Sequence, residues 1–308
     1  MADAFEIVGG KKLSGTIKPQ GAKNEALQII CAALLTEEEV IISNIPDILD
    51  VNLLIELLGD FGVELKKISE GTFSFKAKNI NLDFLYTEKY RSKAARLRGS
   101  IMMIGPLLAR FKKAFIPKPG GDKIGRRRLD THFLGFEKLG ARFEFSNTDN
   151  SFTIDATQLK GAYMLLDEPS VTGTANIVMA AVMAQGTTTI YNAACEPYLQ
   201  QLCNMLNRMG AKISGIGSNL LTVEGVKQLG GTKHTMLPDM IEVGSFIGLA
   251  AMTKGDITIA GVGLDSLGMI PDKFRQLGIE LEIKGDDIHV PSQEHYEINT
   301  FIDGSVLT

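Results

Sequence analysis

The chain has 308 residues, of which 44% are hydrophobic and 22% charged, and its formal net charge is −4 at pH 7. These values are typical of a globular protein of two domains, and the acidic balance argues against a protein that coats nucleic acid. No apolar run reaches the length of a membrane span, and the N-terminal sequence MADAFEIVGG lacks the basic and apolar segments of a signal peptide. We therefore expect a cytoplasmic protein with no membrane contact.

Four similar segments follow one another along the chain. Each begins with a helix of small apolar residues and continues with a strand, a second helix that ends at a glycine, and two further strands. The predicted first helices and the strands after them span residues 24–36 and 39–45, 99–111 and 113–119, 173–186 and 187–193, and 242–255 and 256–262. The pattern predicts an α/β fold built from repeated helix-strand-helix-strand-strand units.

The glycines that end the second helices support this repeat. They stand at positions 62, 140, 210 and 278, which are 78, 70 and 68 residues apart. A glycine directly after a helix readily takes the left-handed backbone conformation that caps the helix C-terminus. Units that recur at a near-constant period usually share one hydrophobic core, although four chance α/β units with similar caps remain the alternative.

The first helices also indicate the domain organisation. They carry almost no charge on any face, so we expect them to be buried on all sides with the sheets packed around them. The turn-rich residues 224–239 predict a domain crossover between the third and fourth segments. We expect one complete domain of three units at residues 21–233 and a second, incomplete domain at residues 1–20 with 234–308. The last stretch of the chain, residues 295–308, is predicted to be a strand.

Cysteine and histidine residues give no sign of a metal centre. Cys31, Cys195 and Cys203 form no Cys-x-x-Cys pair, and the four histidines are scattered. The sequence therefore predicts no disulfide framework, no metal site and no cofactor. We expect the three cysteines to be buried as small hydrophobic residues.

The starts of the first three apolar helices are candidate anion sites. Lys23 and Asn24 open the first helix, Arg98 precedes the second, and Ser170 and Thr172 open the third. Backbone N–H groups and the positive end of the helix dipole favour an anion at such positions. Each start alone also fits a solvated cation or a simple N-cap, but three equivalent starts that converge would form one anion-binding face.

The loop at residues 118–128 carries the densest positive charge of the chain. The sequence PGGDKIGRRRLD, residues 119–130, places Asp122 behind two glycines and before Lys123 and Arg126–Arg128. Adjacent glycines indicate a loop that can approach a ligand closely, and we expect it to cover the anion-binding face as a lid. Nucleic-acid binding by this basic run is the alternative, but the acidic net charge and the lack of a second basic stripe argue against it.

Several motifs resemble those of the enolpyruvyl transferases, namely SGTIKPQGAKNEAL, LRGSIMMIGPLLAR, PGGDKIGRRRLDTHFLGFEKLGA, SVTGTANIVMAA, NAACEP and LPDMIEVGSF. The resemblance covers nearly all of the chain and implies an inside-out α/β barrel fold of two domains with three units each. Its glycine-loop motif is specific to members that transfer the enolpyruvyl group of phosphoenolpyruvate to the 3′-hydroxyl of UDP-N-acetylglucosamine and release phosphate. The resemblance therefore implies a role in bacterial peptidoglycan synthesis. The member that acts on 3-phosphoshikimate is the alternative within the family.

The resemblance also implies roles for individual residues. The matched residues are the cations Lys23, Arg98 and Arg127 around phosphoenolpyruvate and the UDP-sugar, the sugar contact Asn24, the stretch Arg127, Arg128, Leu129 and Asp130 along the uridine, and the stretch Ser170, Val171 and Thr172 near the diphosphate. Asp239 and Glu242 match conspicuous positions, and no catalytic role is expected of them.

Two departures from the family pattern bear on activity. Asp122 stands where most members have cysteine, although some carry aspartate, and we expect Asp122 to act as the acid that protonates the methylene carbon of phosphoenolpyruvate. The second departure is that four units are found where six are expected. An inactive fragment that only binds phosphate or the UDP-sugar is therefore the alternative to a working transferase, and we expect a monomer or a weak oligomer.

Overall fold

The computed structural model describes residues 4–118, 120 and 128–298. The chain divides into two compact units. The large unit comprises residues 22–236, and the small unit comprises residues 1–21 together with 237–308. Asp122 and Arg127 lie outside the described residues.

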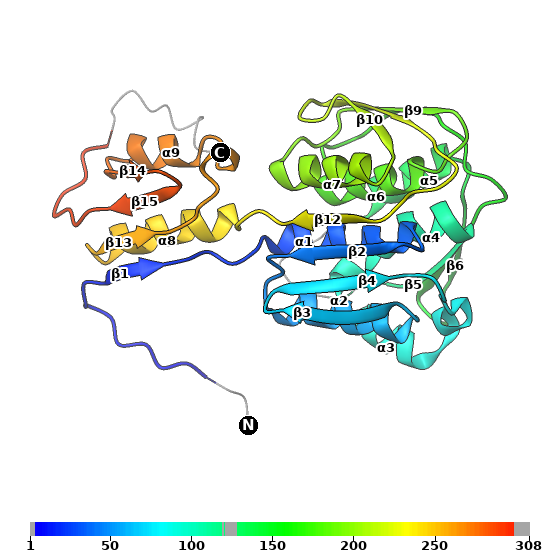
Figure 1. The fold of residues 1–308 in the computed structure, drawn as a ribbon, viewed down its shortest axis with the longest axis horizontal. Helices are drawn as coiled ribbons and strands as arrows, with labels where there is room; N and C mark the ends of the chain where they lie inside the picture. Colours follow the sequence, from blue (N-terminus) through cyan, green and yellow to red (C-terminus); the bar gives the residue numbers. More distant parts are fainter. Residues whose placement is uncertain (1–3, 119, 121–127, 299–308) are drawn as a thin grey trace. The chain divides into compact units, whose positions relative to one another are not determined.

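Four copies of one helix-strand-helix-strand-strand unit account for most elements of the described chain (Figure 1), as the sequence predicts. The copies are α1 (Lys23–Ala32), β2 (Glu39–Ser43), α2 (Leu49–Asp60), β3 (Glu64–Ser69) and β4 (Thr72–Lys76); α4 (Ile104–Phe111), β5 (Lys113–Pro117), α5 (Asp130–Lys138), β6 (Arg142–Ser146) and β7 (Ser151–Asp155); α6 (Val171–Ala181), β9 (Thr187–Tyr191), α7 (Pro197–Arg208), β10 (Lys212–Ser214) and β11 (Leu220–Glu224); and α8 (Met240–Met252), β13 (Asp256–Ile259), α9 (Ile270–Gln276), β14 (Glu282–Lys284) and β15 (Asp287–Val290). The first three copies belong to the large unit and the fourth to the small unit.

Shorter elements connect or extend the copies. They are β1 (Ser14–Ile17), η1 (Ala33–Leu35), η2 (Leu82–Tyr86), α3 (Glu88–Arg96), η3 (Arg98–Met103), β8 (Tyr163–Leu165), β12 (Thr232–Thr235) and η4 (Leu264–Ser266), where η denotes a 3₁₀ helix. The helix predicted at residues 99–111 is therefore divided into a 3₁₀ part, η3, and an α-helical part, α4.

The second helix of every copy ends in the same hydrogen-bonded turn. The glycines at 62, 140, 210 and 278 have φ between +82° and +103°, and each donates its N–H to the carbonyl three residues earlier. The next N–H donates to the carbonyl five residues earlier, from Val63 to Leu58, Ala141 to Phe136, Ala211 to Leu206 and Ile279 to Phe274. These paired bonds define the Schellman motif and confirm the caps predicted from the glycine spacing.

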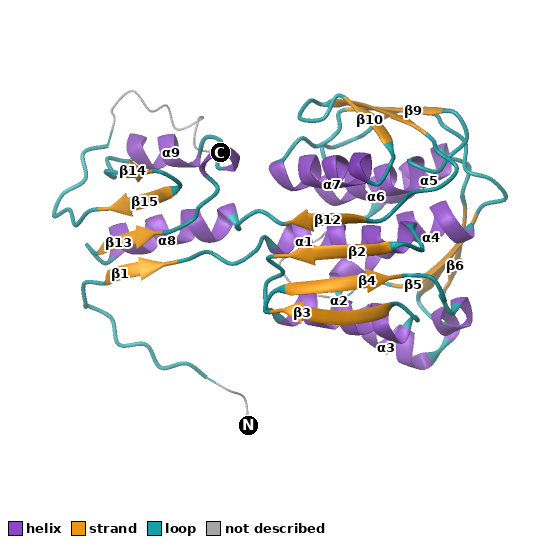
Figure 2. Cartoon of the chain, in the orientation of Figure 1, coloured by secondary structure: helices purple, strands orange, loops and turns teal. Residues whose placement is uncertain are grey.

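The sheets repeat one strand order, which Figure 2 shows for β12, β2, β4 and β3. Three sheets have the orders β12-β2-β4-β3, β8-β9-β11-β10 and β1-β13-β15-β14. The fourth sheet has the order β5-β7-β6 and lacks the flanking parallel strand in the described chain. In the first three sheets the flanking strand comes from outside the copy and pairs in parallel with the copy's first strand. Parallel pairing needs a long connection. Strand β8 reaches β9 through α6, whereas β12 and β1 pair with strands that are distant in the sequence.

Strand β12 corrects the expectation for residues 224–239. These residues contain no strand in the sequence-based prediction, but Thr232–Thr235 pair in parallel with Val40–Ser43 of β2. The segment has few apolar residues and two glycines before it, so its local sequence resembles a loop. Pairing with β2 selects the extended conformation, which local propensity did not reveal.

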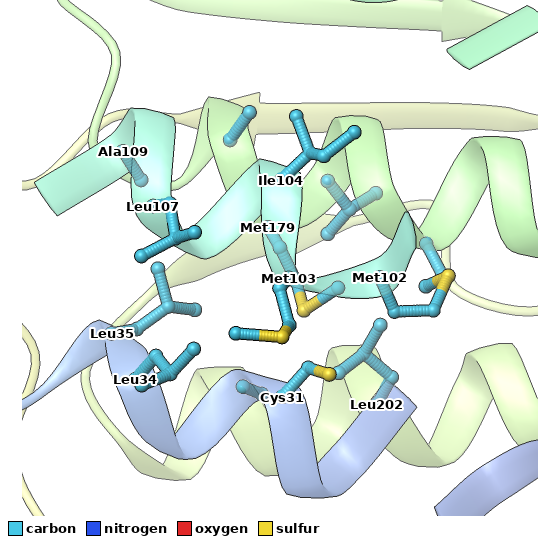
Figure 3. Packing of buried hydrophobic residues seen from close by; sticks show 14 of the residues in the cluster. Cys31, Leu34, Leu35, Met102, Met103, Ile104, Leu107, Ala109, Met179 and Leu202 are labelled. Carbon is cyan, nitrogen blue, oxygen red and sulfur yellow. The ribbon is translucent and has the colours of Figure 1, made fainter. Parts of the chain in front are cut away.

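The first helices of the three copies form the interior of the large unit. Most residues of α1, α4 and α6 are buried. Figure 3 shows Cys31 of α1, Met103 and Ile104, Met179 of α6 and Leu202 of α7 gathered in one apolar cluster. Strand β3, by contrast, is exposed along its whole length. The helices lie inside and the sheets outside, as an inside-out α/β fold requires.

Helix α8 of the small unit contradicts the expectation of burial on all sides. Only Val243, Ile247 and Ala250 of this helix are buried, whereas Ile241 and Met252 are 56% and 85% exposed. In the described part of the small unit, α8 packs against α9 and the strands β13 and β15. These neighbours cover one face, so the apolar composition of the helix did not determine how much of it is buried.

Two further local predictions need correction. Cys31 and Cys203 are buried as expected, but Cys195 is exposed because it lies in the loop between β9 and α7. Residues 295–298 form no strand, and the rest of the predicted terminal strand lies outside the described residues. No helix of the described chain is long and apolar enough to cross a membrane.

Candidate functional site

A cavity of about 720 Å³ lies in the large unit where α1, η3 and α6 begin. Among the residues that line it are Lys23 and Asn24 of α1, Arg98 of η3, Arg128 and Leu129 before α5, and Thr172 of α6. The three helix starts identified in the sequence therefore share one cavity.

The charge of the cavity favours an anion. Among the described residues, its lining includes the cations Lys23, Arg96, Arg98 and Arg128 and the carboxylates Asp50 and Glu168. Four cations against two carboxylates leave an excess of positive charge, although the whole chain carries a net charge of −4. A concave surface lined by one sign of charge concentrates ligands of the opposite sign.

Lys23 begins α1 and forms an ion pair with Asp50 in the first turn of α2. Its Nζ lies 2.5 Å from Asp50 Oδ2, and both side chains are about 40% exposed. Such a partly exposed pair contributes little to stability. Asp50 therefore holds the ammonium group at the cavity wall without burying it.

Arg98 is positioned by the tight packing of η3 on α1. A Cβ atom at Gly99 would lie 2.8 Å from Leu27 Cδ2, so a larger residue here would require the Leu27 side chain to shift. Ser100, which is completely buried, donates its hydroxyl to the Ala94 carbonyl at 2.9 Å. These contacts fix the backbone on both sides of Arg98.

Arg128 and Asp130 interact with each other at the start of α5. Arg128 Nε donates to Asp130 Oδ2 at 2.7 Å, and the hydrogen bond raises the pKa of the guanidinium group. Arg128 lines the cavity, whereas Asp130 does not. Asp130 thus orients Arg128.

The three predicted residues at the start of α6 have different roles in the structure. Ser170 is the N-cap, and its Oγ accepts a hydrogen bond from the Gly173 N–H at 3.2 Å. Val171 packs against the hydrophobic core. Of Ser170, Val171 and Thr172, only Thr172 lines the cavity.

His132 is a cavity residue that the sequence reasoning missed. Its side chain is nearly fully buried; burial, together with the charge of Arg98, lowers its pKa to about 3. Nε2 lies 3.3 Å from Thr172 Oγ1, and Nδ1 lies 3.1 Å from Asn176 Nδ2. The sequence held a signal, because His132 follows Leu129 by three residues and so falls on the same helical face.

Two other predicted residues do not line the cavity, and two lie outside the described residues. Asp239 and Glu242 belong to the small unit. Asp239 caps α8 by accepting from the Ile241 N–H at 2.8 Å, and Glu242 accepts from the Gln20 N–H at 2.7 Å. The two predicted residues Asp122 and Arg127 lie outside the described residues.

Comparison with known proteins gives one consistent family. The family described as EPSP synthase (3-phosphoshikimate 1-carboxyvinyltransferase) matches residues 7–304. The chain is 66% identical to a UDP-N-acetylglucosamine 1-carboxyvinyltransferase of Bacteroides thetaiotaomicron, and the match covers 99% of this chain and 70% of that protein. It is 59% identical, with the same coverage, to a protein of that name from Porphyromonas gingivalis.

Solved structures with the same fold are more distant in sequence. The enolpyruvyl transferase NikO from Streptomyces tendae superposes with a TM-score of 0.80 at 20% identity, over 93% of this chain and 67% of that one. EPSP synthase from Acinetobacter baumannii superposes with a TM-score of 0.67 at 20% identity, over 92% and 66%. These similarities establish the fold that the sequence motifs implied.

Proposed function

The chain belongs to the enolpyruvyl transferase family, and we propose that it transfers the enolpyruvyl group of phosphoenolpyruvate to the 3′-hydroxyl of UDP-N-acetylglucosamine, with release of phosphate. The observation that carries this proposal is the cationic cavity at three equivalent helix starts. The names of relatives at 59–66% identity support the choice of acceptor over 3-phosphoshikimate. The reaction would serve peptidoglycan precursor synthesis in the cytoplasm.

The cations of the cavity would offset repulsion between two anionic substrates. Phosphoenolpyruvate and the diphosphate of the sugar nucleotide both carry negative charge, so bringing them together in a cavity requires fixed positive groups. We assign this role to Lys23, Arg98 and Arg127. An arginine can hold a phosphate or carboxylate through two parallel hydrogen bonds, which also sets its orientation.

The remaining residues would position the sugar nucleotide. We assign Asn24 to the sugar, Arg128, Leu129 and Asp130 to the uridine side, and Ser170, Val171 and Thr172 to the diphosphate. For Asp130 and Ser170 the proposed contribution is indirect, through the Arg128 contact and the cap of α6. Thr172 contributes a hydroxyl that faces the ligand.

The chemistry requires an acid and a base. In the addition step, the sugar hydroxyl loses its proton as its oxygen bonds to the central carbon of phosphoenolpyruvate, and the methylene carbon gains a proton. In the elimination step, the former methylene carbon loses a proton as the bond between the central carbon and the phosphate oxygen breaks. We propose Asp122 as the acid. A carboxyl group must stay protonated for this role. Loss of solvent and the negative charge of the bound substrate would disfavour its charged form, against the opposing effect of the neighbouring cations.

Reactivity towards an epoxide tests the assignment of Asp122. A carboxylate is a much weaker nucleophile than a thiolate, so fosfomycin should not label the protein, whereas the Asp122→Cys variant should gain one covalent adduct detectable by mass spectrometry. Labelling of the unaltered protein at Asp122 would contradict the assignment.

Phosphate release tests the proposed function directly. Phosphate should be released from phosphoenolpyruvate only when UDP-N-acetylglucosamine is present, and Lys23→Met should abolish the release. Lys66→Met, on the exposed strand β3, is the matched control and should retain it. Phosphate release that depends on 3-phosphoshikimate instead would indicate the family member that acts on that acceptor. Tight binding of UDP-N-acetylglucosamine without turnover would indicate an inactive fragment that only binds the sugar nucleotide.

A further inference from the structure

Asn176 is a buried side chain whose orientation is fixed by its neighbours. It is completely buried on α6. The Gly105 N–H donates to its Oδ1 at 2.7 Å, and its Nδ2 donates to the Ile101 carbonyl at 2.7 Å. A backbone N–H can only donate and a carbonyl can only accept. The amide nitrogen is therefore the atom that faces His132.

The orientation of Asn176 determines where His132 carries its proton. Asn176 Nδ2 lies 3.1 Å from His132 Nδ1 and donates to it. Nδ1 must then be the unprotonated acceptor, so a neutral imidazole carries its proton on Nε2. Burial and the nearby Arg98 charge favour this neutral form.

The His132 tautomer in turn orients the hydroxyl of Thr172. Nε2 lies 3.3 Å from Thr172 Oγ1, so the imidazole donates and the hydroxyl oxygen accepts. In the described part of the chain this is the hydroxyl's one hydrogen bond, which leaves the hydroxyl proton available to a ligand. Both His132 and Thr172 line the cavity, and Thr172 is exposed to it.

Close helix packing keeps this chain of hydrogen bonds rigid. A Cβ atom at Gly105 of α4 would lie 2.3 Å from the Asn176 carbonyl oxygen, and one at Gly135 of α5 would lie 2.2 Å from Ile177 Cδ1. Helices α4 and α5 thus approach α6 as closely as glycine allows. His132 and Asn176 therefore cannot drift apart without moving a helix.

We propose that His132 is a positioning residue which, oriented by Asn176, holds the Thr172 hydroxyl as a hydrogen-bond donor to a diphosphate oxygen of the bound sugar nucleotide. The identity of that ligand rests on the proposed function. The inference adds a role for His132 and a specific atom, the Thr172 hydroxyl proton, to diphosphate recognition.

Calorimetric titration of the full chain with UDP-N-acetylglucosamine tests the proposal. Thr172→Val keeps the shape and removes the hydroxyl, and it should weaken binding about tenfold or more, because a hydrogen bond to a charged group is lost. Thr172→Ser, the matched control, should bind within about threefold of the unaltered protein, since it retains the donor.

A double-mutant cycle separates positioning from general damage to the fold. His132→Asn keeps a polar atom near Asn176 but cannot reach Thr172, and it should weaken binding severalfold in the unaltered background. The same change should have no further effect when Thr172 is already valine. His132→Gln can extend a donor to the Thr172 hydroxyl and should recover part of the loss. Independent, additive losses from His132→Asn and Thr172→Val would overturn the proposal.

A ligand-free measurement keeps the outcomes distinct. Nitrogen-15 NMR of the unaltered protein should show His132 neutral, with its proton on Nε2, at neutral pH; a proton on Nδ1 would overturn the inference whatever the binding data show. Equal binding by Thr172→Val would overturn it while leaving the proposed function intact. Failure of the unaltered protein to bind the sugar nucleotide would overturn the proposed function, and with it the ligand named here.

Discussion

Helices α6 and α8 occupy the same place in their repeat units but lie in different surroundings. Both are rich in small and apolar residues, yet α6 is buried from Gly173 to Ala181, whereas α8 buries only three residues. In the large unit, other helices pack against α6, while in the described part of the small unit α8 has α9 and one sheet. Composition makes burial possible, but the neighbouring elements decide it.

One methionine from each helix gives the strongest test of this comparison. Met179 on α6 is completely buried and Met252 on α8 is 85% exposed. Met179→Ala should lower the free energy of unfolding by about 2–5 kcal/mol, because it leaves a cavity in a packed core. Met252→Ala should change it by less than about 0.5 kcal/mol. Urea unfolding of both variants measures the difference, and equal losses would show that α8 is covered after all.

The helix starts sharpen the comparison at the level of function. Arg98 at the start of η3 lines the cavity, whereas α8 starts with the capping residue Asp239. Arg98→Met should reduce kcat/KM by about 100-fold, as expected when a charged group that stabilises the transition state is lost. Arg142→Met on the exposed side of β6 is the control and should leave turnover unchanged. If both variants turned over equally well, Arg98 would have no role in catalysis.

Two glycines test how closely the helices approach in each unit. Gly105 on α4 has no room for a Cβ atom beside Asn176, whereas Gly248 on α8 has no atom within 4 Å of one. Gly105→Ala should cost about 1–3 kcal/mol of stability through overpacking. Gly248→Ala should gain up to about 1 kcal/mol, because alanine favours a helix. Thermal unfolding gives both values, and a loss of stability in Gly248→Ala would contradict the open surroundings of α8.

Two histidines should respond to pH in opposite directions. Burial lowers the pKa of His132 to about 3. Between about pH 6.5 and pH 3, this histidine is therefore protonated in the unfolded chain but neutral in the folded protein. The free energy of unfolding falls as pH falls through this range, by up to about 1.4 kcal/mol per pH unit. In the small unit, hydrogen bonds that His289 donates to the carboxylates of Glu282 and Asp256 raise the pKa of His289. Its contribution is therefore present below about pH 6.5 and is lost as pH rises through the raised pKa.

Variants at these two positions isolate the two effects. His132→Asn should flatten the loss of stability in acid, and His289→Gln should flatten the loss above neutral pH, in urea titrations at several pH values. Identical pH dependence in the two variants would contradict the assigned shifts.

The sequence predicted what depends on local pattern. The repeated units, their C-terminal glycine caps and the residues at the helix starts follow from periodicity and from the backbone freedom of glycine. It did not predict β12, which pairing with β2 creates, or the exposure of Cys195 and α8, which depends on neighbours. His132 was missed because its role arises from contacts with Thr172 and Asn176, which helix packing brings together.

The pairing of β1 with β13 has a consequence for synthesis on the ribosome. Ser14 lies opposite Asp256, so the first strand to emerge waits for a partner about 240 residues later. At about 5–20 residues per second this interval is roughly 10–50 s. During that time the entire large unit is made and can fold, while β1 offers an unpaired edge that a chaperone or a neighbouring nascent chain could bind.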